Sequence, residues 1–74
     1  MAERRFPAPW KVVATPGGYR VEDATGKRIA WFYGEDEPTR RNAMDGITMD
    51  EARKMAVNFA KLPELLKRES ARNR

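Results

Sequence analysis

Residues 10–33 alternate between apolar and polar side chains, and two turn signals divide them into three short segments. The first signal is Pro16-Gly17-Gly18, where paired glycines can adopt the positive φ angles of a tight hairpin. The second runs from Asp23 to Lys27 and predicts a three-residue loop in which Gly26 takes the left-handed conformation. Alternation with a period of two between such turns predicts a three-stranded antiparallel meander.

The alternation also predicts two chemically different sheet faces. The second loop places Val21 across from Ile29. Two positions further along, it places Tyr19 across from Trp31, again a favourable cross-strand pair. The predicted core face carries Trp10, Val12, Ala14, Tyr19, Val21, Ile29, Trp31 and Tyr33. The predicted solvent face carries Lys11, Val13, Thr15, Arg20, Glu22, Arg28, Ala30 and Phe32. Because a shift of one residue exchanges the faces, we expect this contrast to set the register.

A helix is predicted to cover the core face. Thr48 and Glu51 have the spacing of a capping box, in which each side chain accepts a hydrogen bond from the other residue's backbone N–H. Apolar residues then recur at helical spacing: Ala52, Met55, Ala56, Phe59 and Ala60. Pro63 would kink this helix or begin a second short one. The expected fold class is α+β, a three-stranded antiparallel meander covered on one face by a C-terminal helix (β-β-β-α).

The domain organisation follows from chain length and local composition. A chain of 74 residues supports one small core at most, and we expect a single domain over residues 10–67. Residues 1–9 contain two prolines and no periodicity, which predicts an extended arm. Residues 68–74 are rich in charge and are expected to form a frayed basic tail. Before the helix, residues 34–38 have the composition of a loop, and residues 39–44 can form one helical turn after the proline; the sequence leaves the order of residues 35–47 open.

The chain contains neither cysteine nor histidine, which excludes several functional classes. It can form no disulfide, no thiolate metal site and no nucleophile system that depends on histidine. The three acids at residues 35–37 lack the ligand spacing of a calcium loop. A domain of this size also has little room for a catalytic pocket. We therefore expect no enzyme, no catalytic residue, no metal, no cofactor and no small-molecule substrate.

The location is expected to be cytoplasmic. The longest apolar run, residues 29–33, is far shorter than the roughly 20 residues that span a bilayer. No leader with a basic start and an apolar centre opens the sequence. We accordingly expect no membrane partner.

Apolar residues near the C-terminus exceed what one helix face can place against the sheet. An uncovered apolar surface on a small protein usually marks an interface, and the third strand of a meander is an open edge. The sequence therefore predicts a non-enzymatic protein–protein interaction module or a self-associating one. Its expected interface residues are Met55, Leu62, Leu65 and Leu66.

The alternative is nucleic-acid binding by the predicted solvent face together with the basic residues of the two termini. The net charge is +4, which favours encounter with phosphates, although solubility alone accounts for a charge of this size. Lys11, Arg20 and Arg28 surround Phe32, and basic sheet faces with aromatic rings bind RNA by stacking. Against this alternative, Glu22 is expected to neutralise Arg28. One ring is also fewer than the two or three that such sheets use.

Two stretches carry a resemblance to known sequences. The first is GYRVEDATGKRIAWFYG at residues 18–34, and the second is TMDEARK at residues 48–54 leading to AKLPELL at residues 60–66. Together they resemble a group of short alphaproteobacterial hypothetical proteins of unknown function, over about residues 6–67. The resemblance implies no activity, cofactor or site residue.

Overall fold

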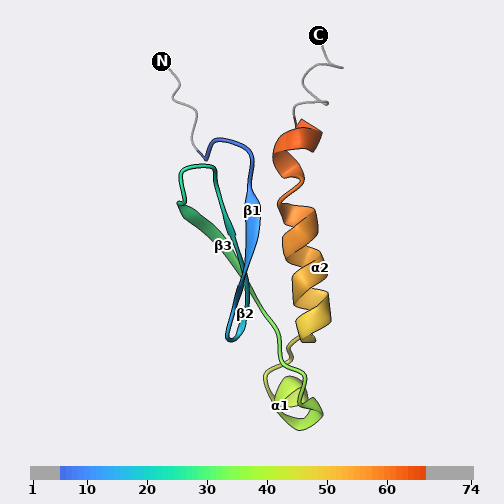
Figure 1. Ribbon diagram of the computed structural model, residues 1–74. Coiled ribbons are helices and arrows are strands. Elements are labelled where there is room, and N and C mark those ends of the chain that lie inside the picture. Colours follow the sequence, from blue (N-terminus) through green and yellow to red (C-terminus); the bar gives the residue numbers. More distant parts are fainter. Residues whose placement is uncertain (1–5, 67–74) are drawn as a thin grey trace.

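A three-stranded sheet and a helix laid against it form the body of the molecule (Figure 1). The computed structural model describes residues 6–66. Its elements are β1 (Lys11–Thr15), β2 (Gly18–Glu22), β3 (Arg28–Tyr33), α1 (Pro38–Ala43) and α2 (Met49–Phe59). The strands pair antiparallel in the order β1-β2-β3, and α2 contacts all three. The predicted α+β class and β-β-β-α organisation are confirmed, and the predicted helical turn after residue 38 is α1.

The start of α2 is fixed by the predicted capping box. The backbone N–H of Glu51 donates to Thr48 Oγ1 at 3.1 Å, and the N–H of Thr48 donates to Glu51 Oε1 at 2.8 Å. Ala52 and Ala56 follow on the side that meets the sheet and are fully buried. Because alanine is small, the helix backbone can approach the strands closely.

The first hairpin has the predicted register. Val12 pairs with Val21, and Ala14 pairs with Tyr19, so these four side chains share the face that α2 covers. Val21 is fully buried at the centre of the sheet. The register of β1 and β2 is therefore confirmed. Two residues depart from the predicted burial: Ala14, on the face toward α2, is exposed, and Glu22, on the predicted solvent face, is buried.

The second hairpin begins as predicted and then departs from the expected register. Gly26 has a φ of 91°, and the N–H of Asp23 donates to the carbonyl oxygen of Lys27 at 2.9 Å, as the three-residue loop requires. Glu22 pairs with Arg28, but the next pair is Val21 with Ala30, so Ile29 is an extra residue in a β-bulge. The expected pairing of Val21 with Ile29 was wrong.

Beyond the bulge, the side chains of β3 lie on the opposite sheet faces from those predicted. Tyr19 lies across from Phe32, and Trp31 lies across from Arg20. Phe32 therefore faces α2, and its ring centroid is 5.6 Å from that of Phe59. Trp31 and Tyr33 are 48% and 63% exposed. One inserted residue moves every following side chain to the other face of the sheet. The predicted faces were therefore wrong for four residues of β3: Ala30, Trp31, Phe32 and Tyr33.

Contacts of Trp10 and of the residues before it join the start of the described chain to α2 and to the β2–β3 loop. The Trp10 ring stacks on Phe59 with centroids 5.4 Å apart, and its Nε1 donates to the carbonyl oxygen of Phe6 at 2.8 Å. The N–H of Ala24 donates to the carbonyl oxygen of Pro7 at 2.9 Å, which ties the arm to the β2–β3 loop. Helical structure resumes over residues 62–66 after a break at residues 60 and 61, which matches the predicted second short helix. The expected tail at residues 68–74 and the first five residues of the arm lie outside the described residues.

Gly34 provides a test of how closely β3 approaches the start of α2. A Cβ at this position would lie 2.6 Å from Met49 Cα and 2.7 Å from the carbonyl oxygen of Thr48, and both are backbone atoms. Forcing such contacts typically costs 1–3 kcal/mol, so we expect Gly34→Ala to lower the free energy of unfolding by about 2 kcal/mol in urea denaturation. Gly17→Ala is the matched control, because its Cβ would meet only Tyr33 Cδ1 at 3.9 Å. Equal stability of the two variants would contradict this packing.

Candidate functional site

The sheet face opposite α2 carries cations around exposed rings. Val13, Arg20 and Trp31 form one row across the three strands. A second row is Lys11, Glu22 and Arg28, and Tyr33 lies at the end of β3 across from Gly18. We call this surface the outer sheet face: Lys11, Val13, Arg20, Glu22, Arg28, Trp31 and Tyr33.

Glu22 orders the charges of this face. Its Oε2 accepts a hydrogen bond from Arg20 Nε at 2.6 Å, and its Oε1 lies 3.9 Å from Lys11 Nζ. The Glu22 side chain is 10% exposed, whereas that of Lys11 is 66% exposed. Glu22 lies across from Arg28 as expected, but its ion pairs are with the other two cations. The cations therefore lie over a carboxylate that is itself withdrawn from solvent.

The outer sheet face carries the rings of Trp31 and Tyr33 instead of the predicted ring of Phe32. The structure brings Lys11, Arg20 and Arg28 together, but Phe32 lies on the opposite side against α2. Sequence reasoning missed Trp31 and Tyr33. Residues 29–33 are all apolar, so the alternation of polar and apolar residues cannot show whether the odd-numbered or the even-numbered side chains of that strand face the helix.

A second exposed surface lies on the C-terminal helical segments. Met55, Leu65 and Leu66 are 49%, 47% and 62% exposed, and Leu62 is half-buried. We call these four residues the helix-end surface. They are the residues that the sequence predicted as an interface, and three of them are large apolar side chains open to solvent.

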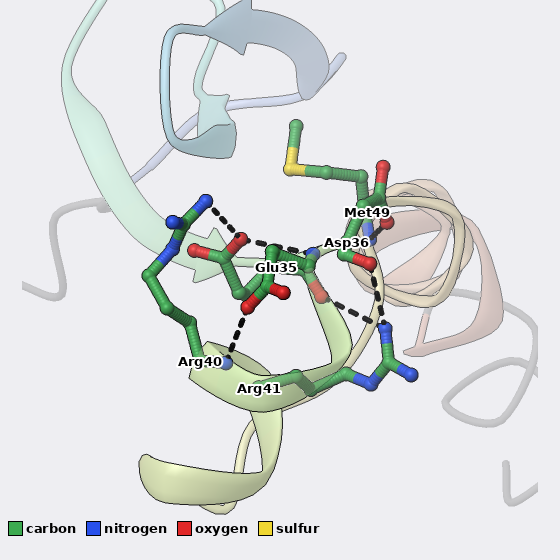
Figure 2. A network of polar contacts seen from close by, with 6 residues as sticks. Glu35, Asp36, Arg40, Arg41 and Met49 are labelled. Carbon is green, nitrogen blue, oxygen red and sulfur yellow. Dashed lines mark hydrogen bonds and ion pairs between the residues drawn. The ribbon is translucent and has the colours of Figure 1, made fainter.

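The acidic loop at residues 35–37 is occupied by structural contacts (Figure 2). Glu35 Oε2 accepts from Arg40 Nη2 at 3.1 Å and from the N–H of Glu37 at 3.0 Å. Asp36 Oδ1 accepts from the N–H of Met49 at 2.9 Å, which ties the loop to the start of α2. The hydrogen bond from Arg40 is the main reason that the pKa of Glu35 is lowered. Within residues 6–66, no three acidic side chains come together as a metal ion would require.

The carboxylate of Asp23 is likewise committed to a turn. Its Oδ1 accepts from the hydroxyl of Thr25 at 2.7 Å, from the N–H of Thr25 at 2.8 Å and from the N–H of Lys27 at 3.0 Å. Asp23 is buried, and the Thr25 hydroxyl bond is the main cause of its lowered pKa. Such a carboxylate holds the β2–β3 loop, and its acceptor oxygen is already shared by three donors.

Comparisons with known proteins add no functional assignment. A scan against family models, a search of curated proteins and a search of solved structures each found no match. The resemblance to short alphaproteobacterial proteins thus stays a prediction. In the described part of the chain, no helix has the length and apolarity needed to cross a membrane.

The variant Asp23→Asn tests whether the Asp23 carboxylate stabilises the β2–β3 loop, through the pH dependence of the free energy of unfolding. Because the pKa of Asp23 is lowered from 3.8, its ionised form stabilises the fold above about pH 4, and this contribution is lost as the pH falls through the folded-state pKa. We expect the variant to be less stable than wild type at pH 7, with a smaller difference at about pH 3. Urea denaturation at both pH values measures this. A stability loss in Asp23→Asn that is independent of pH would contradict this role of the carboxylate.

Proposed function

We propose that this chain is a non-enzymatic interaction module that associates with a second copy through the helix-end surface. The observation that carries the proposal is the exposure of Met55, Leu65 and Leu66. Large apolar side chains left open to solvent on a small protein often mark an interaction site.

The small core gives a reason for a second copy. The fully buried apolar side chains among residues 6–66 are Val21, Ala52 and Ala56, and two of these are alanines. Chains of this size usually gain stability from a disulfide, a metal or a partner subunit. The chain has no cysteine, so association is one of the routes that remain.

The size of the surface sets the expected strength. Stable interfaces bury at least about 1,200 Å² in total, and four side chains per copy supply less than that. We therefore expect a weak dimer, with a dissociation constant of about 50–100 μM.

The absence of catalysis is also part of the proposal. Among residues 6–66, Glu22 and Asp23 are the buried acids and Glu35 and Glu37 are half-buried. Each of the four already has hydrogen-bond or ion-pair partners. We further propose a cytoplasmic location, because small secreted domains usually depend on disulfides and this chain has no cysteine.

Sedimentation equilibrium tests the association at protein concentrations from about 10 to 500 μM, a range that brackets the expected dissociation constant. We expect the wild-type mass to rise toward that of a dimer, and the double variant Met55→Ser, Leu65→Ser to remain monomeric. Met44→Ser is the matched control, since Met44 is 58% exposed and lies outside this surface.

Two results would refute the proposal. One is a wild-type protein that stays monomeric at the highest concentration. The other is a double variant that folds and dimerises as well as wild type, because the contact would then lie elsewhere.

A further inference from the structure

We propose that the outer sheet face binds single-stranded nucleic acid. Trp31 and Tyr33 stack against unpaired bases. Lys11, Arg20 and Arg28 hold the phosphates that connect those bases. This site lies on the opposite side of the sheet from α2 and does not depend on association through the helix-end surface.

The two rings have the exposure and spacing that splayed bases require. Trp31 and Tyr33 leave about half or more of their surface open to solvent, although both are large and apolar. Side chains two positions apart on a strand lie about 7 Å apart, roughly twice the 3.4 Å rise between stacked bases. Consecutive bases of a duplex cannot meet both rings, whereas an extended single strand can. Aromatic stacking of this kind tolerates any base sequence.

The cations lie where the phosphates of such a strand would pass. Arg20 lies directly across from Trp31, on the neighbouring strand. A guanidinium has five N–H donors, and the bond to Glu22 uses the one on Nε. That bond also orients the group before any ligand arrives. Lys11 and Arg28 are exposed on either side of Glu22 in the adjoining row.

Charge and size together favour a nucleic acid over a protein partner. Three cations accompany a single carboxylate on this face, which suits a polyanion. Three strands of five or six residues cover about 14 by 18 Å. That area accommodates two or three nucleotides, but it is well below the roughly 800 Å² that each partner contributes to a standard protein interface.

The experiment is fluorescence anisotropy with labelled ten-nucleotide oligouridine and oligothymidine at low salt. We expect both to bind. Trp31→Ala and Tyr33→Ala should each weaken binding at least about fivefold, and Trp31→Phe should restore most of the loss. A duplex of the same length should bind less tightly than the single strands.

Two arginine variants distinguish binding by the outer sheet face from attraction by the overall positive charge. Arg28→Ala should reduce the slope of log affinity against log salt by about 0.7, the value for one phosphate contact on a single strand. Arg53→Ala removes the same charge from α2 and should leave the slope unchanged. Inorganic polyphosphate should compete poorly, because it offers charge without bases.

The proposal fails if neither oligonucleotide binds at low salt. It also fails if folded Trp31→Ala and Tyr33→Ala bind as tightly as wild type, or if polyphosphate competes as well as unlabelled oligonucleotide. Each of those two results would assign the binding to charge alone, including the basic residues near the two ends of the sequence.

Discussion

One unpaired residue in β3 decides what each side of the sheet presents. Ile29 stands between the pairs Glu22–Arg28 and Val21–Ala30, and the strand beyond it is turned over. Phe32 consequently packs on Phe59, while the two neighbouring rings reach solvent. The core and the outer sheet face therefore have the same structural origin.

The rest of the fold holds that arrangement in place with short-range polar contacts. The Asp23 carboxylate closes the β2–β3 loop. Glu35 and Asp36 bind Arg40 of α1 and the start of α2, and a capping box begins α2. Alanines at the helix–sheet contact let α2 lie close to Val21. A small apolar core thus coexists with two exposed surfaces on different sides of the molecule, one rich in cations and rings and the other in leucine.

Local signals were predictable from sequence, and the register of β3 was not. The capping box and the Asp23–Lys27 loop depend on residues three or four positions apart, so their partners can be identified directly. Arg28 was placed on the correct face because it precedes the bulge. Trp31 and Tyr33 follow the bulge, in a run where every residue is apolar, so no polar residue marks the solvent side. The exposure of Met55, Leu65 and Leu66 was predictable, because the apolar residues near the C-terminus exceed what one helix face can place against the sheet.

The register of β3 is the central claim, and two-dimensional nuclear Overhauser spectroscopy tests it most directly. The account predicts cross-strand contacts between backbone protons of Val21 and Ala30, together with contacts between the ring protons of Phe32 and Phe59. Contacts that instead join Val21 to Ile29 and Trp31 to Phe59 would contradict the bulge and remove the outer sheet face as described.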